Sequence, residues 1–212
     1  STLFPYTTLL RSARLLTRHG NPVGALMYGD HMDAVVPPGR GRRHVLHLLH
    51  RMLDRPVAPV SRATDLAAFL RAALPVMKRR ALVFVVSDFI TSPGWGEQLA
   101  LLARRHEVVA VRLYDPLEME LPDLGLLVLQ DAETGEQEWV DTHDRGFRGR
   151  FAEAARRHEA ELRRGLAQAG VDCLELSTDG RLVEAVLRFA ELRRRRSLLA
   201  GGGLPAHLEG AA

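Results

Sequence analysis

The sequence predicts an α/β fold, a doubly wound and mostly parallel β-sheet with helices on both faces. Residues 81–86, ALVFVV, form an unbroken apolar run, which is typical of a strand buried on both faces of a parallel sheet. A second run of this kind covers 107–114, and amphipathic helical patterns separate the strand-like segments along the chain. Such alternation of strands and helices favours a parallel sheet.

Size and composition bound the class of protein. The chain has 212 residues, 46% of them hydrophobic, which is enough for one domain that folds without disulfides. The single cysteine, Cys173, lies in an apolar run and is predicted to be a buried, unreactive thiol. The net charge of +3 comes from arginine, but aromatic residues do not lie among the arginines, which argues against nucleic-acid binding. No run of about 20 apolar residues and no signal peptide is present, so we expect a cytoplasmic protein without a membrane segment.

The first twelve residues differ from the rest of the chain. They show no helical or strand period, and Thr2–Ser12 resemble the conceptual translation of a sequencing adapter, with Leu10 the one departure. We therefore interpret 1–12 as a cloning or assembly artefact. Residues 13–197 are then a partial domain whose first strand is missing, and 198–212 form a flexible tail.

The remaining elements are predicted in order along the chain. Two strands joined by a tight turn are expected over 22–30 and 32–38. Apolar residues at helical spacing predict a helix over 40–53, and a second helix opens at Thr64, which we expect at its N-cap. Later patterns predict a strand at 81–87, a helix near 97–106, a strand at 107–115, an irregular loop at 115–125, an inserted β-hairpin near 126–142, a helix at 144–169, a strand at 171–178 and a last helix at 179–196.

Asp88 is the residue that the sequence marks most clearly. It follows Ser87 at the carboxyl end of the 81–87 strand, and open α/β sheets place their ligand sites at such strand ends. The alternative is that Asp88 simply caps the next helix. The residues alone leave these two interpretations equally open.

Two further groups of titratable side chains each have two interpretations. His44, His47 and His50 could form a zinc site or lie on a solvated face of their helix, and we favour the solvated face. A second group could bind a cation, carry out acid–base chemistry or simply form a solvated loop, and we favour the solvated loop. This group consists of Asp115, Glu118, Glu120 and Asp123.

Four stretches carry a resemblance to a known family: 23–49, 63–70, 82–89 and 109–136. The last is the most specific, because it combines DP, LPD and D-ETG motifs in one order. Through these stretches the chain resembles a bacterial and archaeal family, domain-of-unknown-function family fifty-eight, whose core is similar to the von Willebrand factor A domain. The resemblance covers roughly residues 13–197.

Domains of the von Willebrand A type carry a metal-ion-dependent adhesion site. Its ligands are an Asp-x-Ser-x-Ser motif after the first strand, a threonine in a second loop and an aspartate after a later strand. By position Thr64 resembles that threonine and Asp88 that aspartate, so the resemblance implies Mg²⁺ ligation by both. The Asp-x-Ser-x-Ser motif is absent here, and we interpret this absence as truncation, with the remaining ligands upstream of the chain. Thr64 and Asp88 alone supply at most two ligands.

The sequence therefore predicts a non-catalytic protein–protein interaction module that binds its partner through Mg²⁺. The resemblance implies a MoxR-type AAA+ ATPase as one partner and an unidentified client protein as another, in protein maturation or assembly, because family members are commonly encoded beside such ATPases. The alternative is a Mg-dependent α/β phosphohydrolase-like enzyme that uses Asp88 and Asp115 at adjacent strand ends.

Overall fold

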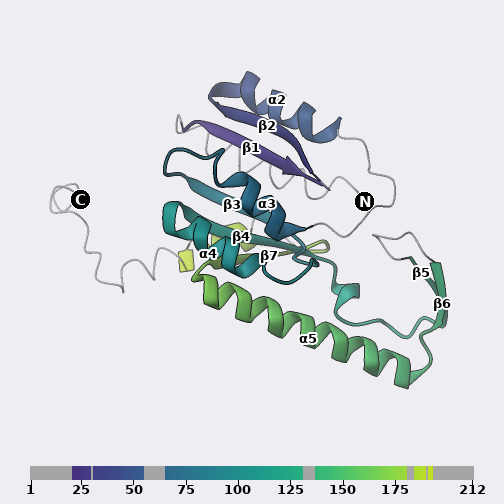
Figure 1. Ribbon diagram of the computed structural model, residues 1–212. Coiled ribbons are helices and arrows are strands. Elements are labelled where there is room, and N and C mark those ends of the chain that lie inside the picture. The colour runs from purple at the N-terminus through teal and green to yellow at the C-terminus, as the bar shows by residue number, and fades with distance from the viewer. Residues whose placement is uncertain are drawn as a thin grey trace, which may run out of the picture.

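A parallel sheet of three strands lies at the centre of the molecule (Figure 1). The computed structural model describes residues 21–29, 31–54, 65–130, 137–180, 184–189 and 191–192. The strand order is β3-β4-β7, with β3 at Leu82–Ser87, β4 at Glu107–Tyr114 and β7 at Asp172–Ser177. Both pairs of neighbours are parallel, as predicted.

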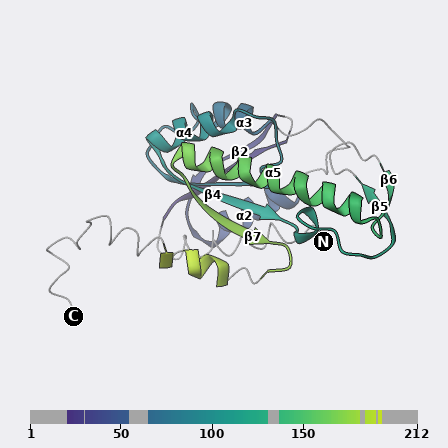
Figure 2. The ribbon, with the colours of Figure 1, turned by 90° about the horizontal axis from the view of Figure 1, so that it is seen from below.

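Helices pack against both faces of this sheet. On one face the main core joins Val85 and Ala110 to α3 (Leu66–Ala73), α4 (Trp95–Arg105) and α5 (Arg145–Ala169). On the other face a second core joins Val109, Val111, Leu174 and Leu176 to the helical residues 184–189. Figure 2 shows α3, α4 and α5 on one side of the sheet and the segment near 184–192 on the other. The predicted α/β class is therefore confirmed.

A separate hairpin precedes the central sheet. β1 (Val23–Tyr28) pairs antiparallel with β2 (Met32–Gly39), and α2 (Gly41–Leu53) covers it through a small core of its own. Within the described ranges this hairpin is not hydrogen-bonded to β3, so the single sheet that we predicted is divided. The ring of Tyr28 stacks on that of Phe69 in α3, with 5.0 Å between centroids.

The predicted hairpin near 126–142 is confirmed. β5 (Leu126–Gln130) pairs antiparallel with β6 (Gln137–Asp141), and Figure 1 shows this pair beside the start of α5 and apart from the central sheet. The turn between the two strands, residues 131–136, lies outside the described residues.

The start of α3 corrects one prediction. The N-cap is Asp65, whose side chain accepts a hydrogen bond of 2.9 Å from the backbone N–H of Ala68, whereas we expected Thr64 there. Both residue types make good N-caps, and only the path of the chain decides between neighbours. Thr64 itself, the segment 1–12 and the tail 198–212 lie outside the described residues. Among the helices that the structure describes, none combines the length and apolarity that a bilayer crossing requires.

Cys173 packs against the main core from β7. Burial, and secondarily the charge of Glu175, raises the pKa of this thiol from 9.0 to about 11. Because the thiolate is the reactive form, we expect alkylation at pH 7 to be about 100-fold slower than for a thiol of the ordinary pKa. The rate of iodoacetamide labelling in native buffer, compared with that in denaturing urea, measures this effect, and equal rates in the two conditions would contradict it.

Candidate functional site

The carboxyl end of β3 is a tight polar corner. The backbone N–H of Phe89 donates to the Ser87 hydroxyl at 3.0 Å, and that of Ile90 donates to Asp88 Oδ1 at 3.0 Å. The Ser87 hydroxyl also donates to Asp88 Oδ1 at 3.3 Å. These contacts form an Asx turn that holds the exposed Asp88 carboxylate in one orientation.

Asp88 does not cap the following helix. The N-cap of α4 is Gly94, in the left-handed conformation at φ 100°, and no side chain accepts a hydrogen bond there. Asp88 uses its Oδ1 within its own turn, six residues before that cap, so the helix-cap interpretation is wrong. Within the described part of the chain, no donor contacts Asp88 Oδ2.

Phe89 holds this corner in place. Its backbone has φ 61°, in the left-handed region that a side chain makes unfavourable by about 1–3 kcal/mol. The ring is 1% exposed and packs against that of Trp95, with 5.2 Å between centroids. Burial of a phenylalanine in the core offsets this strain, so the packing of Phe89 stabilises the corner that presents Asp88.

The loop after Asp88 also contacts the start of α3. The backbone N–H of Leu66 donates to the hydroxyl of Thr91 at 3.1 Å. Leu66 lies two residues after Thr64, and Thr91 lies three residues after Asp88. The structure thus brings the chain next to Thr64 and the chain next to Asp88 together, although Thr64 is outside the described residues.

The neighbouring strand ends add further oxygen atoms to this edge. Asp115, after β4, accepts from the backbone N–H of Leu117 at 2.9 Å through Oδ1 and from the hydroxyl of Thr178, after β7, at 2.9 Å through Oδ2. It thereby caps the short 3₁₀ turn Pro116–Glu118. Burial raises the pKa of Glu118, a backbone hydrogen bond at Asp115 partly opposes this, and the charges of Asp88 and Asp115 raise it further.

The described residues do not form a metal site by themselves. Carboxylate and hydroxyl oxygens are the ligands that Mg²⁺ prefers, and Asp88 offers such an oxygen. Within the described ranges, however, no three histidine, cysteine, aspartate or glutamate side chains converge on one point. Two of the three histidines of α2 have separate partners, since His44 Nε2 contacts the carbonyl of Val23 at 2.7 Å and His50 Nδ1 contacts Asp54 at 2.9 Å. The rings of His44 and His47 lie with 6.5 Å between centroids.

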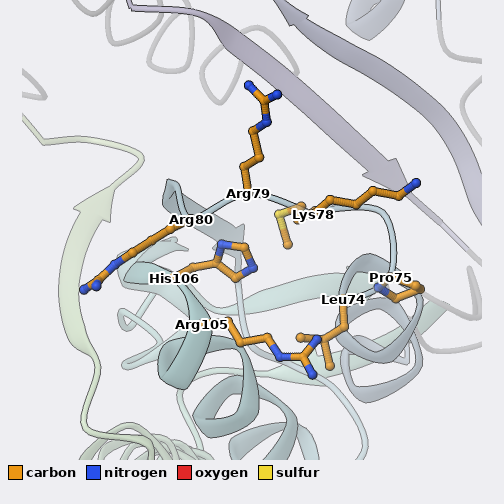
Figure 3. Close-up of a pocket in the computed structure, with 8 residues that line it drawn as sticks. Leu74, Pro75, Lys78, Arg79, Arg80, Arg105 and His106 are labelled. Atoms are coloured by element: carbon orange, nitrogen blue, oxygen red, sulfur yellow. The ribbon is translucent and has the colours of Figure 1, made fainter.

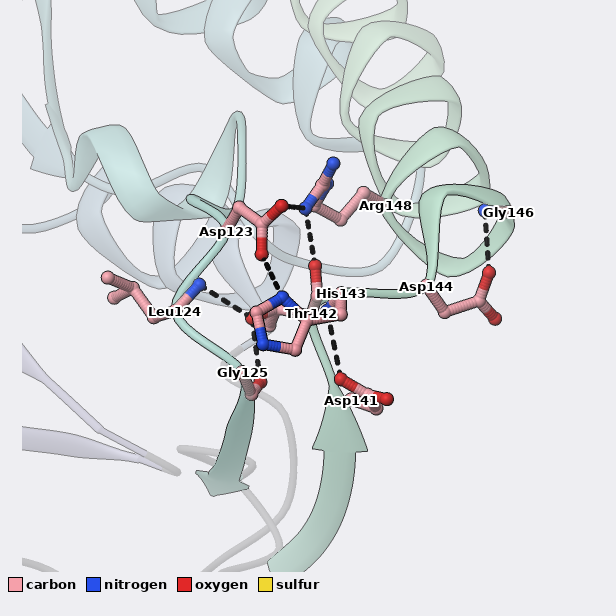
Figure 4. A network of polar contacts seen from close by, with 9 residues as sticks. All are labelled: Asp123, Leu124, Gly125, Asp141, Thr142, His143, Asp144, Gly146 and Arg148. Carbon is pink, nitrogen blue, oxygen red and sulfur yellow. Dashed lines mark hydrogen bonds and ion pairs between the residues drawn. The ribbon is translucent and has the colours of Figure 1, made fainter.

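The loop that contains Asp123 is locked to the start of α5 (Figure 4). Asp123 pairs with His143 and, at 2.8 Å, with Arg148. Hydrogen bonds from these two residues, that of Arg148 first, lower the pKa of Asp123. The fully buried Thr142 accepts from the N–H of Leu124 at 2.9 Å. Asp123 is therefore a structural anchor, separate from the oxygen atoms around Asp88.

Arg112 is a buried charge that the sequence analysis did not identify. It lies in β4 at 5% exposure and pairs with Glu159 of α5 and, at 3.4 Å, with Glu175 of β7. Its guanidinium also lies 5.2 Å from the centroid of the Tyr114 ring. The sequence did contain a signal for this buried charge, namely an arginine inside the apolar run EVVAVRLY. A charged residue in a central strand requires a partner of opposite charge.

The fold and this edge define a class of protein: a mixed α/β domain with oxygen-bearing side chains at the carboxyl ends of its parallel strands. The chain belongs to the family described as Protein of unknown function DUF58, whose model matches residues 8–161. This match confirms the membership in domain-of-unknown-function family fifty-eight that the sequence predicted.

Relatives of this chain occur in mycobacteria. It is 36% identical over 179 residues to the uncharacterized protein Rv1480 of Mycobacterium tuberculosis, a match that covers 84% of this chain and 56% of that protein. It is 39% identical over 163 residues to the uncharacterized protein MAV169 of Mycobacterium avium, a match that covers 77% of this chain and 96% of that protein. The chain therefore spans about half the length of the first of these relatives.

The chain has a weak similarity to a solved structure. The conserved hypothetical protein BatB from Bacteroides thetaiotaomicron superposes with a TM-score of 0.47 at 14% identity, covering 89% of this chain and 88% of that chain. This likeness is too low to assign a fold family to the present protein.

Proposed function

We propose that this chain forms part of a non-catalytic protein–protein interaction module of the von Willebrand factor A type, which binds a partner through Mg²⁺. The observation that carries the proposal is the Asp88 carboxylate, which is exposed, fixed by the Ile90 N–H and free at Oδ2 within the described residues. An exposed and oriented carboxylate can share a hard cation with an acidic side chain of a partner.

The contact between Leu66 and Thr91 supports Thr64 as a second ligand. It holds the beginning of α3, two residues after Thr64, against the loop that follows Asp88. On this proposal Thr64 and Asp88 hold the ion directly or through water, and further ligands come from residues outside the described ranges.

Magnesium titration of the chain followed by ¹H–¹⁵N NMR tests the metal site. We expect Mg²⁺ to shift the amide signals of Ile90 and Leu66, and Asp88→Ala to weaken this response at least tenfold, or about 1.4 kcal/mol. Asp141→Ala is the matched control, because Asp141, in the β5–β6 hairpin, also accepts a hydrogen bond from the N–H two residues on, that of His143 at 2.9 Å. The metal site is refuted if both variants respond alike or if Asp88→Ala keeps the shifts.

A MoxR-type AAA+ ATPase from the same genome is the partner that we propose, acting on an unidentified client protein. Co-elution of the two proteins in Mg²⁺, its loss in EDTA and its loss with Asp88→Ala are the expected results. Co-elution that persists in EDTA would show that the two proteins bind each other without the metal.

The phosphohydrolase alternative needs Asp88 and Asp115 to act together. Both oxygens of Asp115 already accept hydrogen bonds, from Leu117 and Thr178, which favours a structural role for this carboxylate and therefore the binding module. Turnover of a generic phosphate ester with Mg²⁺, lost in both Asp88→Asn and Asp115→Asn, would establish the enzyme instead.

A further inference from the structure

A cavity of about 450 Å³ lies at the amino end of the parallel sheet, the end opposite Asp88 (Figure 3). It is bounded by the turn that follows α3, by the segment that leads into β3 and by the end of α4. The volume is within the range of small-molecule sites, about 300–1,000 Å³. Its charged side chains are all cationic: Lys78, Arg79, Arg80 and Arg105.

These four cations are not neutralised by the described part of the protein. None of them forms an ion pair with a carboxylate of the described ranges. The carboxyl ends of α3 and α4 each add about half a negative charge, which partly stabilises the positive charge of Arg105 at the end of α4. Four full positive charges exceed these two partial charges, so the cavity is strongly positive and favours an anion.

His106 gives the cavity a buried polar group. The side chain is 4% exposed, and within the described residues neither ring nitrogen has a hydrogen-bond partner. Figure 3 shows the ring near the middle of the residues that line the cavity, with the charged ends of Lys78, Arg79 and Arg80 pointing outward from it. Burial, and secondarily the charge of Arg105, lowers the pKa of His106, so the ring is neutral at pH 7 and keeps one N–H to donate.

We propose that this cavity binds a small anion that carries two or more phosphate groups. The exposed side chains of Arg79 and Arg105 would turn inward as its charged donors, and His106 would be a neutral donor. A single phosphate would neutralise only about half of the four positive charges, and the cavity has room for a larger ligand. A phosphate oxygen that reached the ring would give the imidazole N–H the acceptor that it lacks among the described residues. This site is independent of the proposed metal site at the other end of the sheet.

Calorimetric titration of the full chain with inorganic pyrophosphate at low ionic strength tests the site. We expect the double variant Arg79→Ala/Arg105→Ala to weaken binding at least tenfold, because each charge-assisted hydrogen bond contributes that much or more. Arg42→Ala/Arg43→Ala is the matched control, since it removes the same charge from exposed positions of α2 and should change binding less than twofold.

His106→Phe provides a second test, because it leaves the net charge at pH 7 unchanged. A loss of several-fold supports the site, and unchanged affinity refutes the role of the imidazole. Adenosine diphosphate is added in a parallel titration, and affinity equal to that of pyrophosphate shows that the phosphates alone are recognised. An equal loss in the Arg42/Arg43 control, or binding of a single-stranded oligonucleotide without binding of pyrophosphate, would overturn the proposal in favour of non-specific attraction.

Discussion

Replacing Glu159 by alanine should lower the free energy of unfolding by about 3–5 kcal/mol. Glu159 is the closest partner of Arg112, whose side chain is 6% exposed beneath α5. Without this carboxylate the guanidinium remains buried, and among the described carboxylates only Glu175, at 3.4 Å, still pairs with it. A buried charge that loses its partner is far more costly than the pair itself is stabilising, and urea unfolding followed by circular dichroism measures the difference.

Arg163→Ala is the control for this experiment. Arg163 donates to the same Glu159 at 2.9 Å, but its own side chain is 73% exposed, so its removal should cost less than about 1 kcal/mol. The double variant Arg112→Met/Glu159→Met should recover most of the loss, because it removes both charges and keeps the apolar volume. Similar losses in Glu159→Ala and Arg163→Ala would show that burial of Arg112 does not govern the effect.

Replacing Phe89 by alanine should cost about 3–5 kcal/mol. The ring is 1% exposed, so its deletion leaves a cavity against Trp95 within the main core. This loss of stability arises at the corner that presents Asp88. The shift in the midpoint of urea unfolding measures it, provided that the dependence of the unfolding free energy on urea is unchanged. A loss below 1 kcal/mol would mean that the corner repacks around the smaller side chain.

Phe89→Gly separates the ring from the backbone. Glycine adopts φ 61° without strain, so Phe89→Gly should be about 1 kcal/mol more stable than Phe89→Ala. At Ala154, an exposed position within α5, the order reverses, and Ala154→Gly should be about 1 kcal/mol less stable than the parent. If glycine is the worse residue at both positions, the backbone of Phe89 is not strained.

Part of the candidate site could be predicted from local sequence. Asp88 directly follows a short apolar run, so its place at a strand end required no knowledge of distant residues. Its role did require such knowledge, because the helix cap lies at Gly94 and the Asp88 carboxylate turns back to Ile90. The predicted N-cap of α3, Thr64, was one residue too early for the same reason. Asp65 and Thr64 are both good N-cap residue types, and only the path of the backbone determines which of them caps the helix.

The sequence by itself determined the order of strands and helices, the parallel central sheet and the position of Asp88, because these depend on periodicity and on residues close in the chain. Only the tertiary structure decided that the predicted strand pair β1 and β2 stays outside the central sheet, that Arg112 pairs with Glu159 and that Lys78, Arg79, Arg80 and Arg105 line one cavity with His106. These features join segments tens of residues apart. Their energies depend on burial and on charge separation in space, and neither quantity is encoded in the spacing of residues along one segment.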